Sequence, residues 1–244
     1  MIKYALIAAA AVFAVGCNSS PSQSPENKVG GPNVVASAQA PMATATTSLS
    51  LDWGKKGQAG QVAIAQLLSY GGSKPAIAAP AGWLMIRDDS TPTTRQSLYW
   101  HAIQANDAGT ATWAFSAPVD AQGAIVLLDN VASAAPVDMT SGNTGTGGML
   151  TARSIATTAD GDLILSYYAT DFHLPGLLGS SPQMPAETKT LMNQEAASRE
   201  FWILATYQSQ NGVTEDQVCS AAQLFNWAAA QVAIKPANAT PSPP

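Results

Sequence analysis

The sequence predicts an all-β protein, an antiparallel β-sandwich of the jelly-roll or immunoglobulin-like kind. Short apolar or alternating segments recur at a spacing of roughly 10 to 20 residues, with glycine and proline between them. Only 11% of the residues are charged and 46% are hydrophobic, whereas globular chains carry about 25% charged residues. A surface built from hydroxyl and amide groups is typical of secreted β-proteins.

Eight segments carry the strand signals, and glycine-containing turns such as Gly71-Gly72 and Asp160-Gly161 separate them. They are Gln61–Tyr70, Trp83–Arg87, Gln96–Ile103, Thr110–Ser116, Gly123–Leu128, Asp162–Thr170, Phe201–Tyr207 and Trp227–Ile234. Met149–Ala156 and Thr188–Asn193 are two further candidate strands. Helices remain an alternative for Glu187–Ser198 and for Thr214–Asn226, where Thr214 would cap the first turn.

A weak internal sequence similarity suggests that the domain has two halves with a similar order of strands. The segment Asp162–Thr170 resembles Gln61–Tyr70, and Pro182–Pro185 occupies a place comparable to that of Ala79–Trp83. A sandwich made of two related halves would produce this pattern.

The N-terminal sequence predicts a targeting segment. Lys3 precedes the apolar run Ala5–Val15, which is shorter than the about 20 residues that a bilayer-spanning helix needs. The following Ala14-Val15-Gly16-Cys17 resembles the lipobox of bacterial lipoproteins. The resemblance implies a signal peptide over residues 1–16, a lipid anchor on Cys17 and a location in the cell envelope. Asn18 is not the aspartate that retains many such proteins in the inner membrane, which favours the outer membrane in a Gram-negative host.

The remaining chain divides by composition. Residues 17–48 are rich in Ser, Pro, Ala and Thr and predict a disordered tether after the lipidated cysteine. Residues 49–235 form the predicted sandwich domain, and residues 236–244 are a second low-complexity tail.

The motifs of the domain are similar to a β-sandwich module met in bacterial extracellular and phage structural proteins. The resemblance rests on Pro80–Trp83, Arg95–Trp100, Ala108–Ser116, Ala159–Ile164 and Trp227–Ala233, and it covers about residues 58–235. It implies the fold, a location outside the cytoplasm and a binding or structural role. No catalytic residue follows from it.

Charge and cysteine content narrow the function classes. The formal net charge is −5 and the lysines and arginines are scattered along the sequence. Nucleic-acid binding requires clustered cations, so we exclude this class of function. With Cys17 acylated, Cys219 has no partner within the chain, so no disulfide framework is expected. Cys219 is then a buried small side chain, with an intermolecular disulfide or a reactive thiol as alternatives.

Three residues are the candidate ligand-binding positions. Five of the six tryptophans lie in or beside strand segments and are expected in the core, whereas Trp53 stands at the domain entrance and is expected to be exposed. Asp160 and Asp162 are expected to act in a turn. Ca²⁺ binding through their carboxylates, or catalysis by them, are the alternatives.

Other patterns with chemical potential have simpler interpretations. Asp88 and Asp89 cannot point the same way on an extended strand. The two histidines, His101 and His173, lack zinc-motif spacing, so no metal site is expected even though His173 follows Asp171 closely. The glycine-rich run Gly142–Gly148 has no P-loop lysine and is expected to be a flexible loop.

We therefore expect a membrane-anchored, non-enzymatic module that binds glycan or another envelope component or acts in adhesion, without a cofactor. A structural protein with a protein partner and a polysaccharide-acting enzyme are the alternatives. An exposed row of aromatic side chains would favour glycan binding, and two carboxylates facing each other in a cleft would favour the enzyme. A broad apolar face would favour protein assembly.

Overall fold

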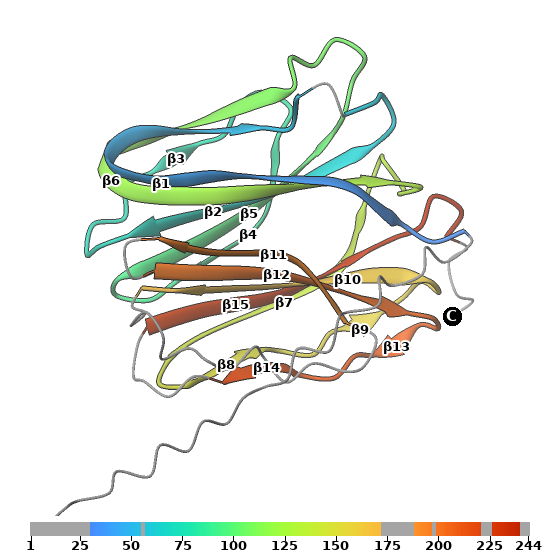
Figure 1. The fold of residues 1–244 in the computed structure, drawn as a ribbon. Helices are drawn as coiled ribbons and strands as arrows, with labels where there is room; N and C mark the ends of the chain where they lie inside the picture. The colour runs from blue at the N-terminus through green and yellow to red at the C-terminus, as the bar shows by residue number, and fades with distance from the viewer. Residues whose placement is uncertain (1–29, 55–56, 172–187, 197–198, 221–225, 240–244) are drawn as a thin grey trace, which may run out of the picture.

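The computed structural model describes residues 30–54, 57–171, 188–196, 199–220 and 226–239. These residues form two antiparallel sheets packed face to face, with smaller strand pairs on the outside (Figure 1). The first sheet has the order β1-β6-β2-β5-β4, and β3 also pairs with β6. Its strands are β1 (Asn33–Asp52), β2 (Val62–Tyr70), β3 (Ile77–Ala78), β4 (Leu84–Ser90), β5 (Thr94–Ala102) and β6 (Thr110–Asp129).

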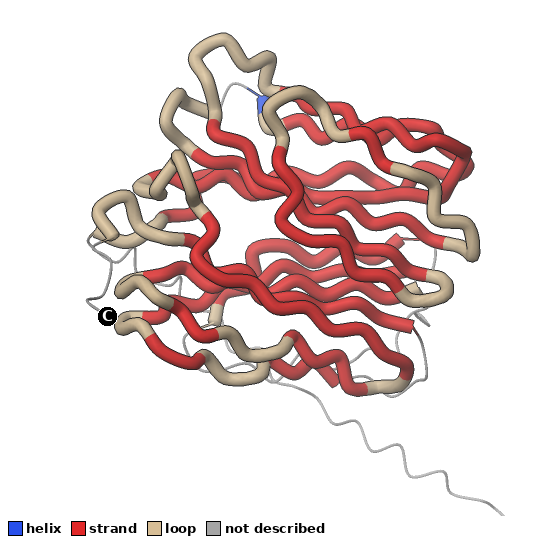
Figure 2. Tube along the Cα trace, turned by 180° about the vertical axis from the view of Figure 1, so that it is seen from behind, coloured by secondary structure: helices blue, strands red, loops and turns tan. Residues whose placement is uncertain are grey.

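The second sheet has the order β11-β12-β10-β15-β7. Its strands are β7 (Val137–Thr146), β10 (Asp162–Thr170), β11 (Lys189–Ala196), β12 (Arg199–Gln208) and β15 (Asn226–Ile234). Two short pairs complete the architecture: β8 (Met149–Ala152) with β14 (Gln217–Ser220), and β9 (Ala156–Thr157) with β13 (Gly212–Val213). The predicted all-β antiparallel fold is confirmed, and the tube view shows strands dominating both layers (Figure 2).

Each sheet comes from one contiguous half of the chain, and the two halves share one strand order. Reading both orders from the strand that opens the half gives β1-β6-β2-β5-β4 and β7-β15-β10-β12-β11. The strands β2 and β10 hold the same central position in their sheets, as the internal sequence similarity of the two segments predicted. A glycine with positive φ precedes each of them, Gly60 at 92° and Gly161 at 80°, a backbone conformation that favours glycine.

The long strands β1 and β6 bend so that their paired ends cover the outer face of the first sheet. Register shifts interrupt the β1–β6 pairing between Ala40 and Ser48, and Ala45 has a φ of 48° in this stretch. Such irregularities bend a strand and increase its twist. In the second half, β8 and β14 form the corresponding outer pair.

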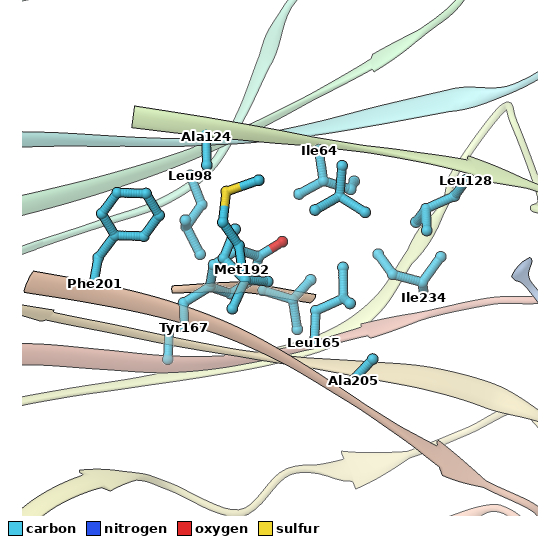
Figure 3. Close-up of a cluster of buried hydrophobic side chains, with 14 of the residues drawn as sticks. Ile64, Leu98, Ala124, Leu128, Leu165, Tyr167, Met192, Phe201, Ala205 and Ile234 are labelled. Atoms are coloured by element: carbon cyan, nitrogen blue, oxygen red, sulfur yellow. The ribbon is translucent and has the colours of Figure 1, made fainter. Parts of the chain in front are cut away.

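The main core lies between the two sheets, where alternate residues of the central strands point inward (Figure 3). Ile64 of β2 and Leu128 of β6 meet Leu165 of β10 and Ile234 of β15, and all four are fully buried. A second core lies on the outer face of the first sheet and is rich in aromatic residues, including Trp83. A third lies between the second sheet and the β8–β14 pair.

The prediction of a disordered tether through residue 48 is wrong for residues 33–48, which belong to β1. An edge strand bonds to one neighbour through its backbone, so small and hydroxyl side chains suffice there and no apolar alternation marks it. The tail prediction also fails at its start, because Pro236 forms a bridge with Val131 and Ala237 N donates to Asn130 O.

Both candidate helices are wrong where the structure describes them. Lys189–Ala196 is β11 and Gln217–Ser220 is β14, because pairing with β12 and β8 overrides the local propensity. The glycine-rich run was expected to be a loop, but Gly142–Thr146 pairs with β15 as part of β7. Gly145 has a reason to lack a side chain there, since a Cβ would lie 2.5 Å from the Trp227 ring.

Across the described residues, no helix has the length and apolar character needed to cross a membrane. The predicted signal peptide, Cys17 and the segment up to residue 29 lie outside the described residues.

Candidate functional site

A pocket at one end of the first sheet gathers Trp53 with several polar side chains. It has a volume of about 370 Å³, and two loops form it: the segment after β1 and the turn between β5 and β6. Backbone bonds tie these loops together, because Trp53 N and Gly54 N both donate to Gly109 O, at 2.8 and 3.0 Å. We call it the Trp53 pocket, and its lining is Trp53, Gly54, Gly57, Gln58, Ala59, Ile103, Gln104, Ala105, Asp107, Ala108 and Gly109.

Trp53 was expected to be exposed, but its residue exposure is 6%. The ring packs edge-on against Trp83 at a centroid distance of 6.0 Å. On another side Gly57 approaches so closely that a Cβ there would lie 2.7 Å from Trp53 Nε1. Trp53 is therefore too buried to serve as an open stacking platform.

Trp83 and His101 do not line the pocket, but each contacts one of its lining residues, Trp53 and Asp107 respectively. Trp83 stacks on the His101 ring at 5.2 Å and meets Trp113 edge-on at 4.8 Å. His101 Nδ1 lies 2.9 Å from Gly82 O, and His101 Nε2 lies 2.8 Å from Asp107 Oδ2. Each ring nitrogen thus lies within hydrogen-bond distance of a protein oxygen, so His101 connects Asp107 with the backbone at Gly82.

The polar groups of the pocket come from the two loops. Asp107 Oδ2 also accepts from Gln104 N at 2.7 Å, which fixes the turn. Gln104 is exposed, and Gln58 is anchored by its backbone N, which donates to Gln61 Oε1 at 2.8 Å. At Gly109, φ is 79° and a Cβ would lie 2.5 Å from Gly54 O, so only glycine fits between the loops. The pocket is therefore lined by two glutamines and an aspartate beside Trp53, and Gln104 Nε2 donates to Ala102 O at 2.9 Å.

The structure does not bring the three candidate ligand-binding residues together. Trp53 belongs to the outer core of the first sheet, whereas Asp160 and Asp162 flank the turn that opens β10 in the second. Asp160 lies in the turn before β10, but its Oδ1 accepts from Asn211 N at 2.7 Å, in a loop 51 positions away, and not from its own turn as the sequence suggested. Asp162 has no exposed surface at all.

Asp162 is instead buried beside Asp138, an acid on β7. Asp138 accepts from Thr158 N at 2.5 Å and from Thr158 Oγ1 at 2.6 Å. Burial alone would raise the pKa of Asp138, but these hydrogen bonds outweigh it and hold the pKa below its usual range. For Asp162, burial first and the neighbouring Asp138 charge second raise the pKa to about 8. At neutral pH, Asp162 is therefore the protonated member of the pair.

The other acids and the cysteine have structural partners. Asp88 accepts hydrogen bonds from Arg95 and Ser97, while Asp89 forms an ion pair with Arg87. The two acidic side chains therefore point apart, as expected. Asp171 accepts from Asn226 N at 2.9 Å and from Thr93 Oγ1, which ties the two sheets together.

Cys219 is 1% exposed in the third core. That core lies against the second sheet, whereas His101 stacks on Trp83 of the aromatic core of the first, so the two residues do not meet. His173 lies outside the described residues. Within the described ranges, no group of three His, Cys, Asp or Glu side chains is arranged to hold a metal ion.

Sequence reasoning missed the polar residues that make the pocket. Asn106–Gly109 signals a turn, but nothing in the sequence indicates that Asp107 contacts His101 or that Gln58 and Gln104 line one pocket. The sequence did not indicate Asp138 as a partner of Asp162 either, because Asp138 lies in a stretch without a strand pattern.

Comparison with protein-family models finds no match for this chain, and comparisons with curated proteins and with solved structures find none.

Proposed function

We propose that this chain is a lipid-anchored, non-enzymatic binding module of the cell envelope that takes a saccharide in the Trp53 pocket. The observation that carries the proposal is the lining of the pocket, which combines Trp53 with Gln58, Gln104 and Asp107. Sugars present hydroxyls to planar polar side chains and apolar C–H groups to aromatic ones. The volume of about 370 Å³ is at the small end of ligand pockets, which suits one or two sugar units.

The burial of the tryptophans decides how a glycan would bind. Trp53, Trp83, Trp113, Trp202 and Trp227 are between 0% and 7% exposed, and Trp100 is partly buried. A flat glycan chain would need several exposed rings in a row. The pocket therefore favours recognition of a chain end or a single branch over recognition of a long polymer face.

The carboxyl pair supports the non-enzymatic form of the proposal. Glycosidases place two carboxyl groups on either side of an accessible bond, about 5–10 Å apart. Asp138 and Asp162 are adjacent, and Asp162 is fully buried. No substrate bond could lie between them.

A second candidate function, assembly with a protein partner, rests on a different observation. Leu84 and Met85 are neighbours on β4, an edge strand of the first sheet, and are 54% and 51% exposed. Exposed apolar side chains on a sheet edge are a feature of surfaces that bind other chains. The two functions are separable by experiment, because Leu84 and Met85 do not line the Trp53 pocket.

The saccharide proposal predicts that Gln58→Ala with Gln104→Ala weakens glycan binding by about tenfold, the effect of losing two hydrogen bonds of about 0.5–1.5 kcal/mol each. The full chain in detergent would be tested on an array of envelope oligosaccharides and peptidoglycan fragments. Gln210→Ala is the matched control, since Gln210 is also an exposed glutamine and lies outside the pocket. Binding that Leu84→Ser and Met85→Ser abolish, and that the glutamine pair leaves intact, would replace this function with protein assembly.

The anchoring part of the proposal has its own test. Cys17→Ser is expected to move the chain from the membrane fraction to the soluble fraction and to abolish incorporation of a clickable palmitate analogue. Cys219→Ser is the control and should retain both, because Cys219 is buried in the fold. Full membrane retention and labelling of Cys17→Ser would contradict a lipid anchor at that residue.

A further inference from the structure

Asp162 is fully buried, and its surroundings favour a protonated carboxyl over a charged one. Both Asp162 oxygens are buried, and among the described residues neither accepts a hydrogen bond from a protein donor. A buried carboxylate without donors is costly, since ionised groups need charge or hydrogen-bond partners when they leave water. A protonated Asp162 avoids that cost because it can donate its own proton to Asp138.

Asp138 is the natural acceptor for this proton. Its carboxylate already receives two hydrogen bonds from Thr158, one from the backbone N and one from Oγ1. It therefore connects three elements: its own strand β7, the start of β10 through Asp162, and the Thr158–Ala159 segment that follows β9. A charged Asp162 would put two negative charges at the centre of this junction.

We propose that Asp138 and Asp162 share one proton, and that this proton makes the junction an alkaline-sensitive latch for the Thr158–Ala159 segment. When the proton leaves to solvent, the two carboxylates repel each other across β15, which lies between β7 and β10 in the sheet. Asp138 then moves away from Thr158 and releases the segment. Thr158 and Ala159 also line a cavity of about 530 Å³ together with Lys235. Opening of the latch therefore changes the wall of that cavity.

The charged groups around Asp162 set the direction of the response. Asp138 on β7 and Asp160 in the preceding turn favour the protonated form, and Lys235 at the end of β15 opposes them. The strands β9 and β13 contribute no ionisable side chain, and the register partner on β12 is Gln208. Burial of the Asp162 carboxyl is the largest cause of its raised pKa, and the charge of Asp138 adds to it, so the proton is held through neutral pH.

Amide hydrogen exchange on the full chain tests the latch. Between about pH 6 and about pH 9.5, after correction for intrinsic exchange, the protection of Thr158 and Ala159 is expected to fall by at least about tenfold. Asp162→Asn should remove this pH dependence, because its amide donates to Asp138 at every pH. Asp160→Asn is the control, since it removes a nearby charge and leaves the shared proton in place, and it should keep the response.

Three results would overturn the proposal. Equal pH dependence in Asp162→Asn would show that the shared proton does not hold the segment. Protection that rises on adding Ca²⁺ to the wild-type chain, and does not in Asp162→Asn, would make the pair a cation site. If Asp162→Asn does not fold, a carboxyl carbon NMR titration of the wild-type chain decides the matter, and an Asp162 signal that titrates in the ordinary acid range would contradict a shared proton.

Discussion

Trp113→Ala is expected to lower the free energy of unfolding by about 3–5 kcal/mol. Trp113 on β6 is fully buried, and its ring contacts Trp83 at 4.8 Å and Tyr99 at 5.9 Å. It therefore connects the bent end of β6 with β5 and with the wall of the Trp53 pocket. Removal of the ring leaves a cavity that these rigid aromatic neighbours cannot fill. Urea unfolding followed by circular dichroism measures the change.

The control for this prediction is Leu84→Ala, a large apolar side chain that is 54% exposed. It should change the free energy of unfolding by no more than about 0.5 kcal/mol. A loss below about 1 kcal/mol for Trp113→Ala would mean that the aromatic core does not hold the outer layer of the first sheet. The pocket would then lack the rigid wall that the proposed binding function needs.

Asp162→Asn is expected to change how the stability of the protein depends on pH. The pKa of Asp162 is raised to about 8 in the folded chain, whereas an aspartate in the unfolded chain has an ordinary pKa of about 3.9. The folded chain therefore keeps a proton that the unfolded chain has lost. The stabilisation from Asp162 is complete below about pH 4, falls as the pH rises from there, and is lost by about pH 8. The slope in this window approaches about 1.4 kcal/mol for each pH unit.

The asparagine variant carries no proton to lose, so its stability should gain on that of the wild type steadily from about pH 4 to about pH 8. Asp138 and Asp120 have lowered pKa values and act in the opposite sense, since their stabilisation is lost on acidification. Subtracting the free energy of unfolding of the variant from that of the wild type at each pH cancels most of the contribution of Asp138 and Asp120. Parallel stability curves for the two proteins across this window would contradict a protonated, buried Asp162.

The sequence predicted the fold class well because the central strands carry strong signals. The segments Gln61–Tyr70 and Asp162–Thr170 are apolar, follow glycine turns and became β2 and β10, each in the middle of a sheet. Strands buried on both faces are mostly apolar, so burial and sequence pattern largely coincide there. The edges were harder, since β1 and β7 are rich in Ser, Thr, Gly and Ala and are held mainly by backbone pairing with β6 and β15.

The candidate site was predictable only in part. Trp53 was singled out for its position, and the structure does place it at a pocket, but packing against Trp83 and Gly57 buries it. Asp162 was singled out for its proximity to Asp160, whereas its actual partner is Asp138, which is 24 positions earlier (162 minus 138) and on another strand. A partner that lies two strands away in the sheet leaves no local pattern, so the sequence alone could not indicate it.

The most direct test of the central claim, that the Trp53 pocket binds a saccharide, is a titration of the full chain followed by tryptophan indole and glutamine side-chain NMR signals. The probe is the oligosaccharide that binds best on the envelope array. We expect the signals of Trp53, Gln58 and Gln104 to shift in a saturable way while those of Trp202 and Trp227, on the second sheet, remain unchanged. Saturable shifts at Trp202 and Trp227 with none at the pocket, or no saturable shift with any array glycan, would contradict the claim.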